Sequence, residues 1–345
     1  MPFPFDVSGQ TPDHRNLYLV QDQALRDRVL PLFSFDPTAP EDRPTGHGTA
    51  FRIDPWARCA TAFHVLEDLF QVDARGRDIT LRDHIRLTAL EIDGQGYGRL
   101  PIPDGAWRPM TGSFSYYRID TPFMQPARLN NLVELMLLRI PPPTQTGQGT
   151  PYLPVKLRGW DPKVGEQVMA LGYADLDRSM TEADAENSDR PFRPYLYASV
   201  GAITTITPPD VERNRMWPIL RVDANWPGAM SGGPVFNEEG YVIGLVSAGF
   251  EGDGGATATY FPPWDVPERI FLSLDPNNPN CFINWGAFDA NGSLVLAGQD
   301  RVGIEAAGRA QGITDFGIVS VNPATEEWMR SSITYATFPA TRDEH

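Results

Sequence analysis

A serine surrounded by glycines is the first residue of this sequence that could do chemistry. Ser231 lies in "ANWPGAMSGGPVFNEEG", residues 224–240. Glycine runs most often form turns, because glycine adopts positive φ without steric cost. Here the run is followed by residues 234–236, a polar turn and the apolar stretch 241–246, a pattern typical of a β-hairpin. A tight loop before a buried strand suits a nucleophile, which must be rigid, exposed and flanked by free backbone N–H groups.

A nucleophilic serine needs a base, and the chain has only five histidines. They are His14, His47, His64, His84 and His345. The stretch 48–70, "GTAFRIDPWARCATAFHVLEDLF", predicts a strand, a turn, a second strand that ends near His64, and a short helix. A histidine at a strand end can reach across a cleft, although a lone histidine there more often only packs or caps the strand.

Four motifs together resemble the chymotrypsin-like serine proteases, most closely the bacterial trypsin-like peptidases of the high-temperature-requirement and glutamyl endopeptidase groups. They are "GTAFRI", "TAFH", "MSGGPVF" and "VIGLVSAG". The resemblance covers roughly residues 40 to 265 and does not reach the two ends of the chain. It implies that His64 is the general base and Ser231 the nucleophile of a catalytic triad.

The resemblance places the acid of the triad in "NNLVELMLLRIP", residues 130–141, where Glu134 stands at the position of the family's aspartate. A carboxylate that enters an apolar strand is costly to bury unless it is paired. Glutamate is one methylene longer than aspartate and can still accept a hydrogen bond from His64. The alternative is that Glu134 faces solvent at the start of the strand. Asp120 and Asp93 are the reserve candidates, but neither precedes a comparable apolar strand.

The resemblance to the family also assigns the oxyanion hole to the backbone N–H groups of Ala229 and Ser231. The family favours glycine at the first position, so Ala229 is a departure that leaves the resting geometry of the hole open. Met230 stands where zymogens of digestive proteases carry an aspartate for a newly cut N-terminus. We therefore expect activation by loop packing or by a partner protein, without trimming of the N-terminus.

The substrate-binding residues are also expectations from the resemblance. Ser247, Ala248 and Gly249 match the strand that lines the cleft and pairs with substrate as an added β-strand. Ser247 is in addition a candidate to bond the acid. Asn225 is expected at the floor of the primary pocket, which argues against a requirement for Arg or Lys in the substrate. Asp223 is the alternative floor residue that would reverse this preference.

The distribution of glycine and proline favours an all-β protein with long loops, because 31 glycines and 33 prolines separate many short β-type runs. The resemblance implies two six-stranded antiparallel β-barrels with N- and C-terminal extensions. The predicted division is an N-terminal extension (1–40), a first barrel with His64 and Glu134 (41–145), a second barrel with Ser231 (146–265) and a C-terminal accessory segment (266–345). Helices are expected only in residues 16–30, 62–70 and 265–274, a linker in 140–154 and a hairpin in 282–298.

Composition narrows the class of partner. The formal net charge of −15 argues against binding nucleic acid or anionic lipid by bulk electrostatics. The sequence has no basic and apolar leader at its start and no run of 18 apolar residues, so no membrane association is expected. The two cysteines, Cys59 and Cys281, fit reduced thiols in the cytoplasm, and Cys59 is expected in the core. Metal-ligand spacing is missing, so we expect no metal and no cofactor.

The resulting hypothesis is a cytoplasmic serine endopeptidase that hydrolyses protein or peptide substrates through a Ser-His-Glu triad. Family context suggests regulation by a partner or effector, as in bacterial stress-response or phage-defence systems. The alternative is a protease-like binding module with lost or restricted catalysis, suggested by Glu134, Ala229 and the long accessory segments. A transferase or esterase on the same scaffold is the third hypothesis.

Overall fold

The structure is a computed structural model, and it describes somewhat more than half of the chain. The described residues are 3–39, 43–53, 58–73, 79–91, 104–115, 117–120, 128–141, 152–155, 161–176, 194–209, 217–247, 256–260, 285–288, 294–298, 317–320 and 336–337. The chain forms two compact units. The first contains residues 1–153 and 162–260, and the second contains residues 154–161 and 261–345.

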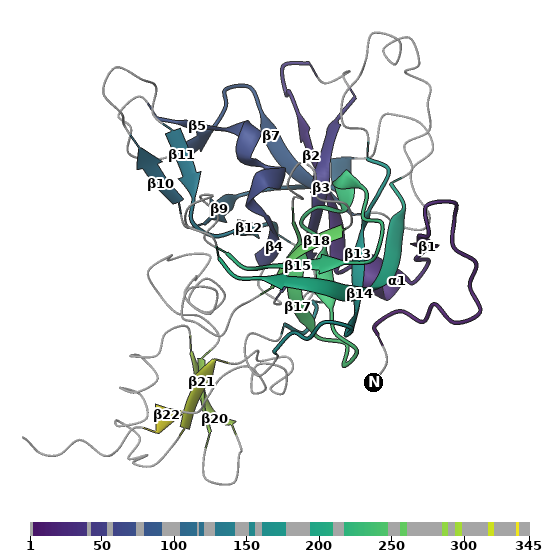
Figure 1. Cartoon of the computed structure of the whole chain (residues 1–345). Helices are drawn as coiled ribbons and strands as arrows, with labels where there is room; N and C mark the ends of the chain where they lie inside the picture. The colour runs from purple at the N-terminus through teal and green to yellow at the C-terminus, as the bar shows by residue number, and fades with distance from the viewer. Residues whose placement is uncertain are drawn as a thin grey trace, which may run out of the picture. The chain divides into compact units, whose positions relative to one another are not determined.

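A closed barrel forms the C-terminal half of the first unit (Figure 1). Its six strands are β13 (Gln167–Tyr173), β14 (Leu196–Thr207), β15 (Ile219–Val222), β18 (Ala256–Tyr260), β17 (Val242–Val246) and β16 (Pro234–Phe236), in that spatial order, and β16 pairs back with β13. All pairs are antiparallel. The short β1 (Tyr18–Leu19) adds to the outside of β14, far from it in sequence.

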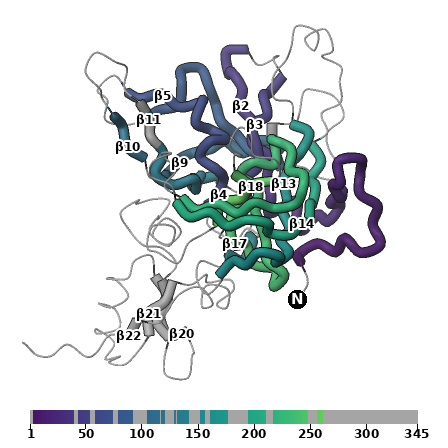
Figure 2. The backbone as a smooth tube through the Cα atoms, in the orientation of Figure 1, coloured from purple at the N-terminus to yellow at the C-terminus, as the bar shows by residue number. Residues whose placement is uncertain are grey.

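The N-terminal half of the first unit is a seven-stranded antiparallel sheet that curves into a half barrel (Figures 1 and 2). Its order is β8 (Trp107–Pro109), β7 (Arg86–Leu90), β2 (Val29–Phe35), β3 (Thr45–Arg52), β4 (Arg58–Ala62), β12 (Leu135–Arg139) and β9 (Gly112–Phe114). Strands β4 and β12 are buried almost throughout, which explains their continuous runs of apolar and small residues.

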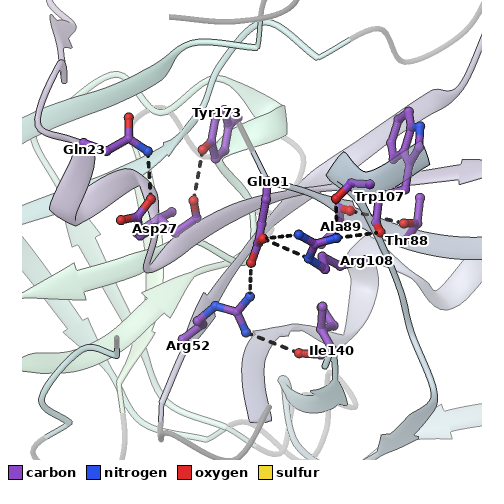
Figure 3. Close-up of polar contacts among 12 residues, drawn as sticks. Gln23, Asp27, Arg52, Thr88, Ala89, Glu91, Trp107, Arg108, Ile140 and Tyr173 are labelled. Atoms are coloured by element: carbon purple, nitrogen blue, oxygen red, sulfur yellow. Dashed lines mark hydrogen bonds and ion pairs between the residues drawn. The ribbon is translucent and has the colours of Figure 1, made fainter. Parts of the chain in front are cut away.

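An ion-pair network around the buried Arg52 side chain ties the strands of this sheet together (Figure 3). The Arg52 side chain is fully buried, donates to the Ile140 carbonyl beyond β12 and pairs with Glu91 at 2.6 Å. Arg108 on β8 binds the other carboxylate oxygen of Glu91 at 2.8 Å. Because a buried charge is tolerated only when it is paired, these contacts hold β3, β8 and the end of β12 in register.

Helical structure is scarce, as expected, but it differs in detail. Residues 16–30 were predicted as a helix and instead contain β1, the four-residue α1 (Gln23–Arg26) and the start of β2. Tertiary strand pairing outweighs the local pattern here, because β1 and β2 find partners in β14 and β3. The segment 62–70 forms two short 3₁₀ turns, η1 (Phe63–Val65) and η2 (Glu67–Leu69). Residues 265–274 lie outside the described residues.

The remaining elements are small. Two-stranded ribbons form from β5 (Phe70–Val72) with β6 (Ile79–Leu81) and from β10 (Tyr117–Asp120) with β11 (Arg128–Asn131), and the 3₁₀ turns η3 (Asp104–Ala106) and η4 (Gly228–Met230) precede β8 and Ser231. The second unit contains a four-stranded sheet of β20 (Leu294–Gly298), β19 (Trp285–Phe288), β21 (Gly317–Ser320) and β22 (Ala336–Thr337).

The predicted fold class is confirmed. A closed six-stranded barrel beside a half-barrel sheet is a chymotrypsin-like double β-barrel, and the expected hairpins are present as β16–β17 and β19–β20. Most of the predicted linker 140–154 lies outside the described residues. None of the described helices has the length and apolar character needed to cross a membrane.

Candidate active site

Strand pairing brings His64 and Glu134 to the same edge of the first sheet. Strand β4 ends at Ala62 and β12 begins at Leu135, and these two residues are opposite each other in the antiparallel register. His64 follows β4 on η1, and Glu134 immediately precedes β12. The Phe63 N–H donates to the Glu134 carbonyl oxygen at 2.6 Å, which fixes the two backbones against each other. The register therefore places an imidazole beside a carboxylate.

The Glu134 carboxylate is buried and bonded on both oxygens. His64 Nδ1 contacts Oε1, and the Ser247 hydroxyl, which follows β17 in the second barrel, donates to the same oxygen at 3.1 Å. The Asn131 amide donates to Oε2 at 3.3 Å. The Glu134 side chain is only 3% exposed, whereas that of His64 is 26% exposed. The acid is thus enclosed, while the histidine is accessible from the solvent side.

Ser231 lies directly after η4, on the loop that enters β16. Gly232 follows with a φ of +82°, and its N–H donates to the Val246 carbonyl at 2.8 Å. A Cβ at Gly232 would lie 2.2 Å from Thr61 Oγ1 and 2.3 Å from the Thr49 carbonyl oxygen. The glycine after the serine is therefore required both for its positive φ and for the close approach of the first sheet.

Thr49, which sequence reasoning missed, fastens the serine loop to the first sheet. Its N–H donates to the Ser231 carbonyl at 2.8 Å, and its hydroxyl donates to the Ala229 carbonyl at 3.0 Å. The same hydroxyl accepts a hydrogen bond from the Tyr173 N–H at 3.0 Å. A single fully buried threonine thus links β3, β13 and the serine loop. Because its partners are backbone atoms distant in sequence, no local motif marks it.

One of the two predicted oxyanion donors is already used. The Ser231 N–H donates to the Gly228 carbonyl at 3.2 Å, as the last bond of the η4 turn. While the Ser231 N–H is bonded to this carbonyl, it is not free to bind a substrate oxyanion. The expectation that Ala229 and Ser231 form a hole stays a prediction, and it requires the Gly228–Ala229 peptide to reorient.

The serine and the histidine come from the two halves of the first unit and are not hydrogen-bonded to each other among the described contacts. Ser231 is 8% exposed, and its loop is held by the contacts to Thr49 on β3. In the absence of substrate, catalytic hydrogen bonds are often long or poorly aligned and shorten when substrate binds. The arrangement provides a buried carboxylate, an imidazole that it contacts, and a serine on a rigid loop.

Comparison with known proteins decides the family. The model of the trypsin-like peptidase domain matches residues 48–245, more than half of the 345-residue chain. The chain belongs to the trypsin-like peptidase family. A search of curated proteins found no match.

Solved structures similar to this peptidase include Deg5, at 15% identity and a TM-score of 0.41, covering 69% of this chain and 85% of Deg5. The inactive form of the Rv3671c protease matches at 16% identity and a TM-score of 0.40, covering 72% of this chain and 89% of that chain. A variant of Rv3671c from M. tuberculosis H37Rv, also inactive, matches at 16% identity and a TM-score of 0.38, with coverages of 72% and 88%.

The other predicted site residues of the peptidase have varied surroundings. Asn225 is exposed, and its side-chain amide donates to the Arg15 carbonyl at 3.1 Å, in the N-terminal segment. Asp223 is exposed as well. Asp120, a reserve acid, pairs with Arg118 at 2.8 Å on a separate ribbon. Ala248, Gly249 and Asp93 lie outside the described residues. The pocket and the substrate strand therefore stay predictions.

A second carboxylate lies near the His64–Glu134 pair of the peptidase. Desolvation, followed by the negative charges of Glu134 and Asp68, raises the pKa of Glu67 above its usual value, and the His64 ring opposes this shift. Glu67 stands three residues after His64, on η2, and no sequence motif singles it out. Among the described residues, no group of His, Cys, Asp or Glu side chains is placed to hold a metal ion.

Proposed function

We propose that this peptidase is a serine endopeptidase that cleaves peptide bonds of protein substrates, with Ser231 as nucleophile, His64 as general base and Glu134 as the orienting acid. The Ser231 hydroxyl attacks the scissile carbonyl carbon while His64 Nε2 accepts its proton. His64 then donates that proton to the leaving amine, and water hydrolyses the acyl-enzyme by the same route.

The contact between His64 Nδ1 and the buried Glu134 carboxylate is the observation that carries the proposal. A carboxylate on Nδ1 selects the tautomer that leaves Nε2 unprotonated, and it stabilises the imidazolium that forms during attack. The bonds from Ser247 and Asn131 hold the carboxylate in one orientation. Glutamate can therefore replace aspartate here, because the backbone and its hydrogen-bond donors accommodate the longer side chain.

Turnover by this route needs both oxyanion donors. Each donor contributes about 10²–10³ in kcat in enzymes of this kind. In the proposed cycle, substrate or an activating partner protein turns the Gly228–Ala229 peptide so that the Ser231 N–H is released from the Gly228 carbonyl. The bond at 3.2 Å is long for an N–H···O contact, which makes its exchange for an oxyanion inexpensive. We place this activity in the cytoplasm, on the basis of the two cysteines.

The binding-module hypothesis is favoured by the same bond, because a permanently occupied Ser231 N–H would leave the serine without oxyanion stabilisation. Such a protein would bind extended peptides by strand addition and release them uncut. The two functions differ in one measurable respect, which is whether the bound peptide is cleaved.

Cleavage of a peptide library, followed by mass spectrometry, tests the proposal. The wild-type chain should produce defined cuts, and Ser231→Ala should lower kcat by about 10⁶. Ser113→Ala, an exposed serine on β9, is the matched control and should change kcat less than about twofold. Peptides that bind to the wild type and are recovered intact under all conditions would favour the binding module instead.

A further inference from the structure

The N-terminal segment 13–20 is built onto the second barrel. Strand β1 pairs with β14, with Tyr18 opposite Ala198, and the Val20 N–H donates to the Leu196 carbonyl at 2.9 Å. Leu17 and Val20 are 1% and 2% exposed. Burial of two aliphatic side chains of this size anchors the segment firmly, so it forms part of the fold.

A tight turn precedes β1 and presents one arginine. The Asp13 carboxylate accepts from the Leu17 N–H at 3.0 Å, and the Asp13 N–H donates to the Leu17 carbonyl at 2.8 Å. Asn16 has a φ of +63°, a conformation that asparagine tolerates. Arg15 projects from this turn with its Nε bonded to Asp13 at 2.8 Å. The turn thus fixes the position of both the side chain and the carbonyl of Arg15.

Arg15 docks its guanidinium on the barrel. Both terminal nitrogens bind the Asp175 carboxylate just beyond β13, one of them at 3.1 Å, and the guanidinium lies 5.0 Å from the centre of the Tyr197 ring on β14. Burial, then the charge of Asp175, raises the pKa of Tyr197 to about 12, so the ring stays neutral beneath the cation. A bidentate pair with ring stacking is the geometry in which arginine is not replaceable by lysine.

The carbonyl of the same arginine holds the connection that leads to the nucleophile. Asn225 donates to it at 3.1 Å, and the Ser199 hydroxyl donates to the Asn225 carbonyl at 3.4 Å from the β14 side. A Cβ at Gly201 would lie 2.4 Å from the Asp223 carbonyl oxygen, so the start of this connection packs directly on the β14 backbone. Residues 223–227 are therefore held by β14 and by the N-terminal segment.

We propose that residues 13–20 act as a built-in strap that holds the connection 223–227, with Arg15 as its positioning residue. The effect on activity rests on the proposed function, because this connection runs into η4 and then into Ser231. Loss of the strap frees the Asn225 side chain and thereby changes the predicted primary pocket. Substrate binding should suffer more than the chemical step.

Amide hydrogen exchange tests the strap without reference to catalysis. Arg15→Ala should speed exchange of the amides in residues 223–228 by about 3- to 10-fold, the size expected for loss of one partly exposed bidentate pair. Arg118→Ala, which breaks another exposed arginine–aspartate pair at 2.8 Å, is the matched control and should leave these amides unchanged. Unchanged exchange in Arg15→Ala, or equal acceleration in Arg118→Ala, would overturn the strap.

Kinetics on a peptide taken from the library tests the consequence. Arg15→Ala and Asp175→Asn should each raise KM by about 3- to 10-fold with kcat changed less than about threefold, and the double variant should be no worse than either single one. Arg15→Lys should recover only part of the loss. Asn225→Ala, which leaves the turn intact, should also raise KM. A fall in kcat alone, or additive effects, would contradict a positioning role.

The two proposals fail in different ways. A wild-type chain that cuts no peptide contradicts the endopeptidase, while faster exchange in Arg15→Ala still upholds the strap. A wild-type chain that cuts peptides, with unchanged exchange and KM in Arg15→Ala, contradicts the strap alone.

Discussion

The two halves of the candidate site are held in different ways. The acid–base half, His64 and Glu134, is fixed by side chains, because three of them bind the buried carboxylate. The nucleophile half is fixed by backbone, because Ser231 is positioned by the Thr49 N–H, by the Gly232–Val246 bond and by the η4 turn. The first half already has the contact that the proposed triad requires, whereas in the second half the Ser231 N–H, a proposed oxyanion donor, is bonded to the Gly228 carbonyl.

This difference teaches where regulation can act. A side-chain network around a buried charge is expensive to rearrange, since each lost partner leaves the carboxylate less well satisfied. A peptide that exchanges one backbone hydrogen bond for another costs little. We therefore expect the acid–base half to be constant and the nucleophile half to respond to substrate or to a partner.

The largest effect should come from breaking the acid–base half. Glu134→Gln should lower kcat by about 10³–10⁴ with little change in KM, because the amide no longer selects the productive tautomer of His64 or stabilises its cation. Steady-state kinetics on one library peptide measures both constants. Near-wild-type rates in this variant, with loss of activity in Asp120→Asn or Asp93→Asn, would show that another carboxylate is the acid.

Glu134→Asp sharpens the same test. It keeps the charge but withdraws the carboxylate by one methylene from His64, Ser247 and Asn131, so activity should fall although less than in Glu134→Gln. Full activity in the aspartate variant would mean that the site is not fitted to glutamate.

The next effect concerns the backbone of the nucleophile half. Gly232→Ala should destabilise the protein by roughly 2–4 kcal/mol, because a side chain there meets Thr61 Oγ1 and the Thr49 carbonyl and must adopt positive φ. Thermal unfolding measures the loss. Gly105→Ala is the control, since a Cβ there meets nothing within 4 Å. A Gly232→Ala protein as stable as Gly105→Ala would mean that the serine loop does not lie against β3 and β4.

A smaller effect on kcat is expected from removing the Ser247 hydroxyl, which bonds the Glu134 carboxylate. Ser247→Ala removes one donor from the Glu134 carboxylate and leaves two, so kcat should fall by about tenfold. Asn131→Ala, whose bond is longer at 3.3 Å, should have the lesser effect of the two. Rates equal to the Ser113→Ala control in both variants would show that the orientation of the acid does not depend on these donors.

The smallest effect is a pH dependence of stability. The pKa of Glu67 is raised in the folded protein, so folding favours the protonated side chain. The stability that this protonated side chain contributes is fully present below the usual pKa of glutamate, and it is lost as the pH rises through the pKa in the folded protein. Glu67→Gln should therefore raise the Tm relative to wild type at about pH 7 and leave it unchanged at about pH 4. A Glu67→Gln variant whose Tm gain is larger at about pH 4 than at about pH 7 would contradict the raised pKa of Glu67.

Sequence reasoning recovered what local patterns encode. The motifs around Ser231, Glu134 and His64 carried the family resemblance, and that resemblance predicted the double barrel and the residues at its edges. The register of β4 with β12 then explains why His64 and Glu134 meet. The buried position of Cys59 was also predicted and is confirmed.

The features that sequence reasoning missed depend on contacts between distant segments. The predicted N-terminal helix failed because β1 pairs with β14, nearly 180 residues away along the chain. Thr49 was missed because it binds backbone atoms, and the bond from the Ser231 N–H to the Gly228 carbonyl was missed because a backbone hydrogen bond leaves no trace in residue types. Asn131 had a weak signal, as a polar residue three positions before a buried carboxylate.

Covalent labelling with a fluorophosphonate, mapped by tandem mass spectrometry, tests the central claim most directly. Such probes phosphonylate a serine only where a base activates it and donors stabilise the developing charge. We expect a single adduct on Ser231, absent from Ser231→Ala and formed at least about 10³-fold more slowly in Glu134→Gln. An adduct on a different serine, or no adduct under conditions in which the protein cleaves peptides, would contradict the assignment of Ser231 as the nucleophile.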